Sequence, residues 1–255
     1  MGFTSAIGAI FMFPLRIIIR VCVALRIHPN VLTLIGVCIN LAAAWALARG
    51  RFVVAGVIMV AANLFDFIDG KVAHASGTAS EFGGFWDSVM DRFSDLALFL
   101  GLVYLYGTLQ RADYVLVTAL AMIFTVLTSY TRARAESLIE KCKVGFMERP
   151  ERIVLFMIGA FTDRMAAVMW VILILSIVTV ANRIHYTYLV LNDKPIPTGP
   201  NALTAAFSRA FFWRDERTTI PYDMWVVAIL AFIWLTPPDW LRDPTAAGRD
   251  IATLL

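Results

Sequence analysis

The sequence predicts an all-α integral membrane protein: a six-transmembrane-helix bundle with an N-terminal amphipathic interfacial helix and a C-terminal extension holding a further apolar segment. Three observations predict this class. Of the 255 residues, 60% are hydrophobic and only 16% are charged, whereas soluble domains carry about 25% charged residues. The mean hydropathy is +0.74. The apolar residues also fall into runs of membrane-helix length separated by short polar turns.

The composition also excludes several classes. The net charge is only +3, and the basic residues lie in loops beside apolar runs, so nucleic acid is not expected as a partner. Three cysteines without close spacing predict neither a disulfide framework nor a thiolate metal site. The first apolar run contains Arg16 and Arg20 and is therefore expected to stay as structure rather than be removed as a signal.

Residues 1–28 are predicted to form the amphipathic helix at the cytoplasmic interface, with a true span as the alternative. Arg16 and Arg20 are spaced to share one helix face among apolar residues. The sequence His28-Pro29-Asn30 should break this helix, because proline stops helix propagation and Asn30 can cap the helix that follows.

Residues 29–191 form the predicted six-helix catalytic domain. The expected spans cover residues 32–47, 52–65, 85–106, 112–138, 153–161 and 165–180. The fourth is apolar as far as Thr128 and polar beyond it, so we expect it to leave the membrane while still helical. The basic loop KCKVGFMERPER then leads into the fifth.

Basic residues predict the orientation. In the six-span arrangement most arginines and lysines fall on one side, and the other side has Arg49, Arg51, Arg111 and Arg164. The positive-inside rule puts the more basic side in the cytoplasm. The sequence therefore predicts a plasma-membrane protein whose chemically interesting loops face the cytoplasm.

Residues 192–255 form the extension. It opens with the linker PIPTGP, and residues 203–213 are predicted to form a short interfacial helix. Residues 224–235 are strongly apolar but short for a span unless the flanking tryptophans lengthen them. An extra span, a re-entrant segment and a surface segment all remain open.

The densest group of ionisable residues runs from Asp66 to Asp91 and reads DFIDGKVAHASGTASEFGGFWDSVMD. Asp66 and Asp69 share one face of a helix by their spacing. Asp87 and Asp91 share a face of the next helix in the same way. Two antiparallel helices can turn these faces together, and four close carboxylates need a cation, for which oxygen ligands favour Mg²⁺, Mn²⁺ or Ca²⁺. The alternative is a solvated loop with helix-capping aspartates.

Four small residues lie among these carboxylates: Gly70, Ala73, Gly77 and Gly83. Their small side chains would let a bulky phosphorylated ligand approach the backbone.

The complete pattern from Asp66 is D-x2-D-G-x2-A-H-x8-G-x3-D-x3-D. It resembles the signature of the CDP-alcohol phosphatidyltransferase family, with His74 at the position of the family's arginine. The resemblance implies six transmembrane helices, usually in a homodimer. It also implies that a CDP-linked lipid or alcohol enters at the cytoplasmic interface, and that its substituted phosphoryl group passes to an acceptor hydroxyl with release of CMP.

The resemblance also implies individual roles. Asp66, Asp69 and Asp87 match ligands of one or two divalent cations, Mg²⁺ or Mn²⁺, and Asp91 matches the general base and shares in metal binding. Histidine at position 74 is shorter than arginine and is only partly charged near neutral pH, so it is a weaker partner for a phosphate. The expected CDP-binding set is Asn30, Thr33, Asp66, Gly70, Ala73, His74, Gly77 and Gly83.

A second cluster predicts an anionic acceptor. Ser129 and Arg132 are three residues apart, and Arg149 and Arg152 repeat that spacing. Two such pairs on the side of the aspartates would form a phosphate pocket, although ordinary positive-inside loop charge is the alternative.

The stretches SYTRARAE, VGFMERPER and TVANRIH resemble segments of the phosphatidylinositol-phosphate synthase branch of the family. This resemblance implies CDP-diacylglycerol as donor and inositol 1-phosphate as the anionic polyol phosphate acceptor. The expected acceptor-phosphate residues are Ser129, Arg132, Arg134, Arg149, Arg152 and Arg183.

Other functions remain open at this point. The nearest enzyme alternative makes phosphatidylglycerol phosphate from glycerol 3-phosphate, which is also an anion. A transporter or ion-binding membrane protein would need acids near mid-span and a repeated second half, and neither is present in the sequence. A catalytically inactive lipid-binding scaffold is the third alternative, with His74 as its only support.

Overall fold

The computed structural model describes residues 15–195 and 220–245, and all regular secondary structure in these two ranges is helical. The expected interfacial helix over residues 203–213 lies outside them, as do residues 1–14. The labelled helices are α2 (Pro29–Ala48), α3 (Phe52–Ala75), α4 (Glu81–Thr108), α5 (Ala112–Glu136), α6 (Arg149–Thr162), α7 (Met165–Leu191) and α9 (Ile220–Leu235).

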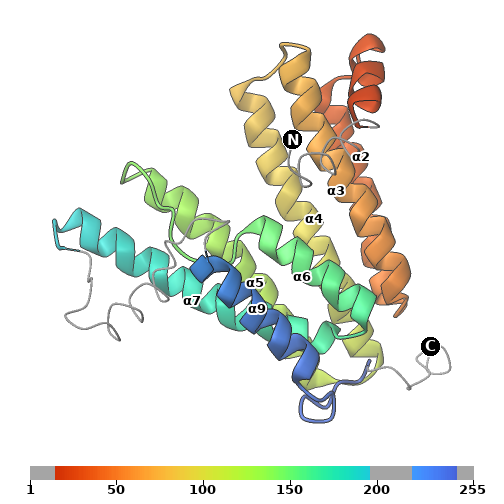
Figure 1. Ribbon diagram of the computed structural model, residues 1–255, viewed down its shortest axis with the longest axis vertical. Helices are drawn as coiled ribbons and strands as arrows, with labels where there is room; N and C mark the ends of the chain where they lie inside the picture. The colour runs from red at the N-terminus through yellow and green to blue at the C-terminus, as the bar shows by residue number, and fades with distance from the viewer. Residues whose placement is uncertain (1–14, 196–219, 246–255) are drawn as a thin grey trace.

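The helices form two groups of three that pack side by side. Helices α3 and α4 both pack on α2, and α7 packs on α5 and α6. The groups meet through contacts of α4 with α5 and of α3 with α6 (Figure 1). The polar stretches of α3, α4 and α5 lie at one end of the interface between the two groups, and the candidate site is at this end.

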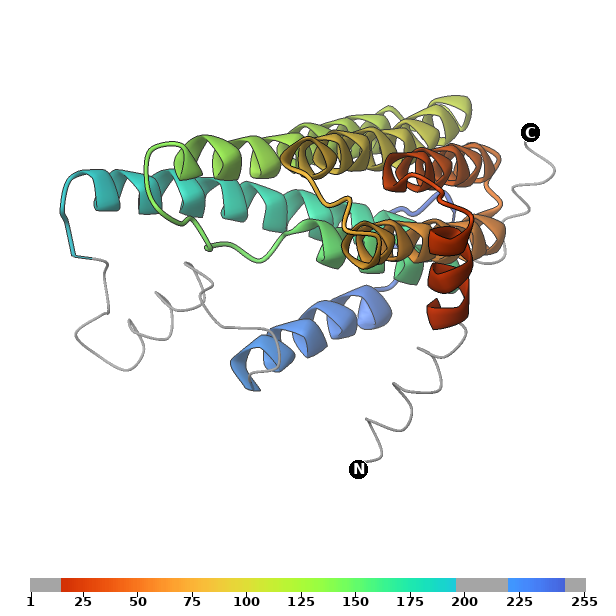
Figure 2. The same ribbon diagram turned by 90° about the horizontal axis from the view of Figure 1, so that it is seen from above.

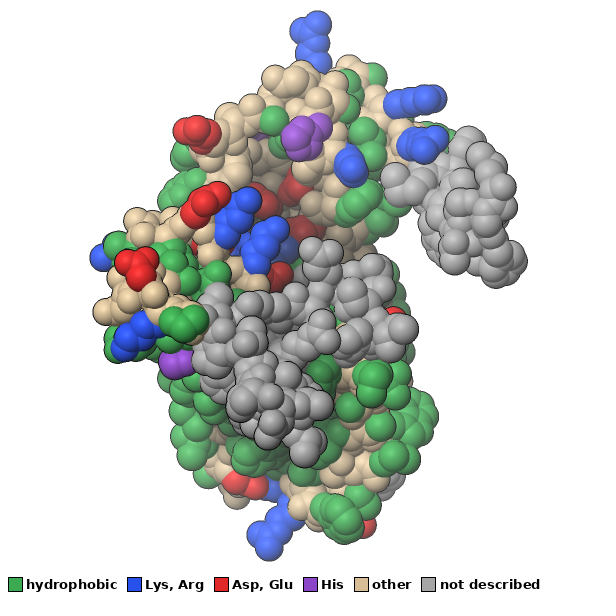
Figure 3. Space-filling model, turned by 60° about the vertical axis from the view of Figure 1, so that its left-hand side comes forward, with side chains coloured by type: hydrophobic (Ala, Val, Ile, Leu, Met, Phe, Trp, Pro, Cys, Tyr) green, Lys and Arg blue, Asp and Glu red, His purple; other side chains and the backbone are tan. Residues whose placement is uncertain are grey.

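The surface is that of an integral membrane protein. Within the described residues, four helices are long and apolar enough to cross a membrane: α2, α3, α5 and α7. Helix α4 has 28 residues but carries carboxylates in its first half, and α6 has only 14 residues. The lower half of the face in Figure 3 is largely hydrophobic, whereas acidic and basic side chains gather higher up.

Close backbone contact holds α4 against α2. A Cβ placed on Gly101 of α4 would lie 2.3 Å from the carbonyl oxygen of Ala44, so only glycine allows this approach. Where the two groups meet, the ring of Phe99 contacts that of Phe156 edge-on at 5.0 Å between centroids. These contacts fix α4, which carries half of the candidate site.

Two helices run beyond their predicted membrane spans. Helix α3 was expected to end within the aspartate stretch, and it continues through Asp66 and Asp69 to Ala75 and stops before Gly77, whose φ is +67°. Helix α7 was expected to end near Arg183, but it runs to Leu191. Its last turns stay helical because Tyr186 and Val190 pack on a small apolar cluster that follows α5, comprising Ala135, Ile139, Cys142 and Val144.

Residues 15–24 are helical and pack on α2 and α3. Leu15, Ile19 and Cys22 belong to an apolar cluster with side chains of both helices, while Arg16 and Arg20 are exposed. The helix is therefore apolar on its inner face, and its outer face carries Arg16 and Arg20 beside the exposed Ile17, Ile18 and Val21.

Helix α9 lies along the outside of the bundle (Figure 2), where it contacts α7 and faces α6 across an apolar groove. At its start, the hydroxyl of Tyr222 donates to Oε1 of Glu151 in the first turn of α6 at 3.1 Å. Just beyond its end, the carbonyl of Thr236 accepts a hydrogen bond at 2.9 Å from Nη1 of Arg164, which follows α6. The apolar segment of the extension is thus packed against the bundle.

Candidate metal and phosphate site

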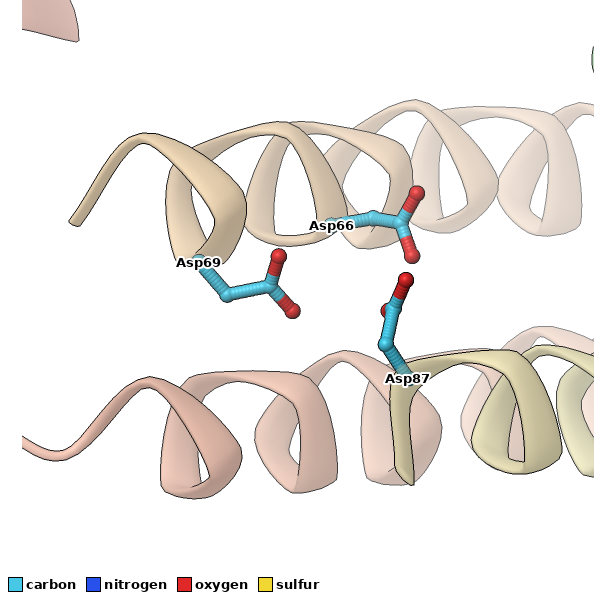
Figure 4. Close-up of side chains that lie close together, drawn as sticks. All are labelled: Asp66, Asp69 and Asp87. Carbon is cyan, nitrogen blue, oxygen red and sulfur yellow. The ribbon is translucent and has the colours of Figure 1, made fainter. Parts of the chain in front are cut away.

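Three of the predicted aspartates converge between two helices. Asp66 and Asp69 extend from α3 and Asp87 from α4, with their carboxylates directed toward one another (Figure 4). One carboxylate oxygen from each lies within 4.8 Å of the other two. The helical spacing thus brings these side chains together, as the sequence predicted.

A third helix orients this carboxylate triad. The Oγ1 hydroxyl of Thr33 on α2 donates to Oδ2 of Asp69 at 2.6 Å, and both residues are buried. Helix α4 begins at a capping serine, because the backbone N–H of Gly83 donates to Oγ of Ser80 at 3.0 Å. Asp87 therefore lies on the second turn of a well-defined helix.

The triad fits a hard divalent cation. Its ligands are all carboxylate oxygens, which Mg²⁺ and Mn²⁺ prefer. The Oδ1 atom of Asp87 is buried without a hydrogen-bond partner, and a buried carboxylate oxygen without a partner is costly unless a cation binds it. Three converging carboxylates with one such oxygen match the requirements of at least one ion.

Asp91 lies one turn further along α4 and is paired with an arginine. Nη2 of Arg149 contacts Oδ1 of Asp91 at 2.9 Å, and Nη1 of the same arginine contacts Oδ2 of Asp66 at 2.8 Å. Sequence reasoning placed Arg149 with the acceptor phosphate. The structure places its guanidinium between the triad and the carboxylate predicted to be the base.

Asp95 is a functional neighbour that sequence reasoning missed. It is 4% exposed and forms an ion pair with Arg152, which is 3% exposed. Its Oδ1 also lies 3.7 Å from Nε of Arg149. The spacing in the sequence could have identified it, because Asp95 follows Asp91 by four residues, as Asp91 follows Asp87.

A cleft of about 400 Å³ opens beside this ion-pair network, between α4, α5 and the start of α6. Five of the six predicted acceptor residues line it: Ser129, Arg132, Arg149, Arg152 and Arg183. Arg134 is exposed and donates to Oγ of Ser137 at 3.3 Å, so the structure does not bring it to this acceptor cleft.

Glu148 is a second residue that sequence reasoning missed in the acceptor cleft. Its Oε1 contacts Nη1 of Arg132 at 2.7 Å and Nη2 of Arg183 at 3.4 Å. The buried Arg183 also donates from Nε to the carbonyl of Val144 at 3.0 Å and from Nη1 to the carbonyl of Thr128. Arg183 of α7 therefore connects α7 to α5 and to the loop that follows α5, at one side of the cleft.

A second cleft of about 440 Å³ lies on the other side of Arg149, between α3 and α6. Among its lining residues are Asp66, Gly70 and His74 of the predicted CDP-binding set. A Cβ on Gly70 would meet nothing within 4 Å, so the groove is open there. Arg149 and Pro150 line both clefts, and the two cavities therefore meet at the carboxylates.

The remaining predicted CDP-binding residues lie around the triad. Asn30 is near Gly83, where an added Cβ would lie 3.8 Å from its Oδ1. Ala73 is half-buried on α3, and Gly77 is exposed beyond its end. In Figure 3 acidic and basic side chains surround a hollow in this region of the surface.

Comparison with known proteins gives a consistent result. The sequence model of a family described as CDP-alcohol phosphatidyltransferase matches residues 26–190. An archaetidylinositol phosphate synthase of Pyrococcus horikoshii is 35% identical over 173 residues, which cover 68% of this chain and 89% of that protein. A phosphatidylinositol phosphate synthase of Mycobacteroides abscessus is 33% identical over 167 residues, covering 62% of this chain and 76% of the relative.

Solved structures of a phosphatidylinositol phosphate synthase from Mycobacterium tuberculosis resemble this fold. The form with CDP-DAG bound has a TM-score of 0.63 at 28% identity and covers 67% of this chain and 92% of its own. The form in complex with manganese and citrate has a TM-score of 0.62 at 28% identity, with coverage of 67% and 87%.

Proposed function

Because the chain belongs to the CDP-alcohol phosphatidyltransferase family and is a transferase, we propose that it moves a phosphatidyl group from CDP-diacylglycerol to inositol 1-phosphate and releases CMP. One observation carries this proposal: two clefts, one lined by the expected donor residues and one by the expected acceptor arginines, meet at Arg149 beside the carboxylate triad. A transferase needs its two substrates to meet at such a point.

The donor is assigned to the side of α2 and α3. Thr33, Gly70 and His74 lie next to the triad or in the cleft beside it, and a related synthase has been solved with CDP-DAG bound. His74 is exposed at the rim, where its ring can donate one hydrogen bond to a phosphate and Lys71 of the same cleft adds a permanent charge.

The carboxylates of Asp66, Asp69 and Asp87 would hold one or two divalent cations, Mg²⁺ or Mn²⁺. A bound divalent cation neutralises the charge that develops on the leaving phosphate. A related synthase has been solved in complex with manganese. The buried Oδ1 of Asp87 without a hydrogen-bond partner supports this assignment from the present structure.

Asp91 is proposed as the general base. Its carboxylate lines the acceptor cleft and lies one helical turn beyond Asp87, so an acceptor hydroxyl reaching the triad passes it. In this role Asp91 accepts the hydroxyl proton as the new bond to phosphorus forms. Arg149 holds the carboxylate in place through its 2.9 Å contact, and Asp91 would also be able to share in metal binding if that contact were displaced.

The acceptor phosphate is assigned to the arginines of the second cleft. Arg132 and Arg149 present partly exposed guanidinium groups there, and guanidinium pairs with phosphate bidentately. Ser129 adds a hydroxyl, while Arg152 and Arg183 hold the walls through their buried ion pairs. Relatives named as inositol-phosphate lipid synthases favour inositol 1-phosphate over glycerol 3-phosphate.

The same proposal includes the setting of the site. Helices α2 to α7 would cross the plasma membrane as six spans, with residues 1–28 as an amphipathic helix at the cytoplasmic surface, the active site facing the cytoplasm and two copies forming a homodimer. The positive-inside distribution supports the orientation. The exposed Arg16 and Arg20 outside an apolar inner face support the interfacial placement.

Purified protein supplied with Mg²⁺ and CDP-diacylglycerol tests the function when each labelled acceptor is added separately. We expect a lipid phosphate product and CMP with inositol 1-phosphate, and no product with the Asp66→Asn variant. Product from glycerol 3-phosphate but not from inositol 1-phosphate would overturn the acceptor assignment. Full turnover in the presence of excess chelator would overturn the metal assignment.

A further inference from the structure

Helix α9 lies outside residues 26–190, which match the family model, yet it begins beside the acceptor cleft. Its neighbour there is the segment 146–152, which forms the end of the loop after α5 and the first turn of α6. This segment carries three charged residues that line the cleft, namely Glu148, Arg149 and Arg152. Any element that fixes this segment also fixes those side chains.

Tyr222 of α9 touches the segment at both of its ends. Its hydroxyl donates to Oε1 of Glu151 at 3.1 Å, and Glu151 lies between the two cleft arginines in sequence. Its ring packs on that of Phe146, with centroids 5.7 Å apart and planes at 49°. One side chain therefore contacts the segment before Glu148 and after Arg149.

The far end of α9 is attached to the opposite side of the bundle. Arg164 donates to the carbonyl of Thr236, and the hydroxyl of Tyr114 on α5 donates to the carbonyl of Leu241. The buried Asp243 accepts hydrogen bonds at 2.8 Å from both the backbone N–H and the hydroxyl of Thr245. The end of α9 is thus held by specific contacts to α5 and to the turn after α6.

Between these ends α9 and α6 are not closely packed. An apolar groove of about 400 Å³ separates much of their length, and its lining includes Val154 and Ile158 of α6 and Val226 and Ile229 of α9. Loose apolar packing does not specify one position along a helix, whereas a hydrogen bond to a carboxylate has a defined geometry. The Tyr222 contact therefore gives the start of α9 a defined position against the first turn of α6.

We propose that α9 fixes the first turn of α6 and that Tyr222 is a positioning residue for Arg149 and Arg152. The inference rests on the proposed function in one respect, since those arginines are assigned there to the acceptor phosphate. It gives the C-terminal extension a role in acceptor binding that the family-matched part of the chain does not supply.

Hydrogen–deuterium exchange of the full-length protein tests the physical contact without any substrate. Tyr222→Phe keeps the ring on Phe146 and removes only the hydroxyl. We expect faster exchange in peptides covering residues 146–156, with the rest of the bundle unchanged. Tyr104→Phe is the matched control, because it removes the same group from a side chain of α4 that is 59% exposed.

Steady-state kinetics tests the consequence. Loss of one hydrogen bond to a charged group should raise the KM for inositol 1-phosphate by about three- to tenfold. The KM for CDP-diacylglycerol should rise less, because Arg149 lines both clefts whereas Arg152 lines only the acceptor cleft. A merely structural role would raise both KM values by the same factor and lower the melting temperature. If the two groups act through their shared contact, Glu151→Ala combined with Tyr222→Phe should be no worse than Glu151→Ala alone.

The two readouts separate this inference from the proposed function. A wild-type protein inactive with inositol 1-phosphate would contradict the function and leave the exchange experiment as the test of α9. Exchange over residues 146–156 that is the same in Tyr222→Phe and Tyr104→Phe would overturn the positioning role. A parallel rise in both KM values would overturn it as well.

Discussion

At the scale of the residue, the carboxylate triad depends on a neighbour from another helix. Thr33 donates to Asp69 at 2.6 Å in a buried setting, which is the kind of outer contact that orients a metal ligand. We expect Thr33→Val, which keeps the shape and loses the hydroxyl, to weaken Mn²⁺ binding by about tenfold or more. Electron paramagnetic resonance titration of free Mn²⁺ measures this directly. Thr33→Ser keeps the donor and should bind Mn²⁺ like the wild type.

Arg149 supplies a positive charge at the place where the triad would bind a cation. It contacts Asp66 and Asp91 at once, so its charge competes with a metal ion for Asp66. Arg149→Gln should therefore bind Mn²⁺ more tightly in the absence of substrates, and yet turn over more slowly because the acceptor phosphate loses a partner. Weaker Mn²⁺ binding in this variant would show that Arg149 supports the metal site rather than competing with it.

The buried pair of Asp95 and Arg152 should contribute more to stability than any exposed pair. Asp95→Asn leaves the guanidinium of Arg152 buried without a countercharge, and the expected loss is about 3 to 5 kcal/mol. The matched control is Asp113→Asn, whose pair with Arg111 is solvent-exposed and worth about 1 kcal/mol or less. Melting in detergent compares the two, and equal shifts would show that burial does not set the difference.

The sequence predicted that Asp66, Asp69 and Asp87 converge, but it did not predict the partners of the site residues. Helical spacing was enough to put Asp66 and Asp69 on one face of α3, and Asp87 and Asp91 on one face of α4, because helix geometry is local. The contact of Arg149 with Asp66 joins residues 83 positions apart, and no local pattern predicts it. Glu148 was missed for the same reason, since its two arginine partners come from α5 and α7.

At the scale of the element, the position of α4 depends on one glycine. Gly101→Ala would place a methyl group 2.3 Å from the carbonyl oxygen of Ala44, and this backbone atom cannot move without shifting α2. We expect a loss of about 1 to 3 kcal/mol. Gly107→Ala, further along α4 with nothing within 4 Å, should be neutral or stabilising by about 0.5 to 1 kcal/mol. Melting temperatures in detergent test both, and equal effects would contradict close packing at Gly101.

The starts of helices were easier to predict from the sequence than their ends. The predicted helix starts near Leu32 and at Phe52 lie within three residues of the observed starts at Pro29 and Phe52, because local turn signals mark them. The end of α7 was placed too early because Arg183 was taken as the limit of the helix. Tertiary packing of Tyr186 and Val190 continues α7 where composition alone does not predict it. The apolar segment of the extension could not be assigned because it is hydrophobic on all sides and indicates no buried face.

At the scale of the whole molecule, one buried acid at the end opposite the site should make stability depend on pH. Burial raises the pKa of Asp243, although hydrogen bonds from Thr245 oppose the rise. Since the unfolded chain has the ordinary value of 3.8, the folded state binds more protons just above that pH, and stability falls as pH increases through the window up to the raised pKa. The penalty then persists to neutral pH.

Asp243→Asn removes this ionisation and keeps an oxygen that can accept from Thr245. We expect the melting temperature of the variant, relative to wild type, to be higher at pH 7 than at pH 4. The difference between the two proteins isolates Asp243 from the other buried acids. A difference that does not change with pH would show that folding does not raise the pKa of Asp243.

The short length of α6 has a consequence for the surrounding lipid. Its 14 residues span only about 21 Å, whereas the hydrocarbon layer of a bilayer is about 30 Å thick. If α6 crosses the membrane as proposed, this hydrophobic mismatch would be relieved by local thinning of the bilayer. Asp66 on the neighbouring α3 and Arg149 in the first turn of α6 line the same cleft, so thinning there would shorten the distance between lipid headgroups and the candidate site.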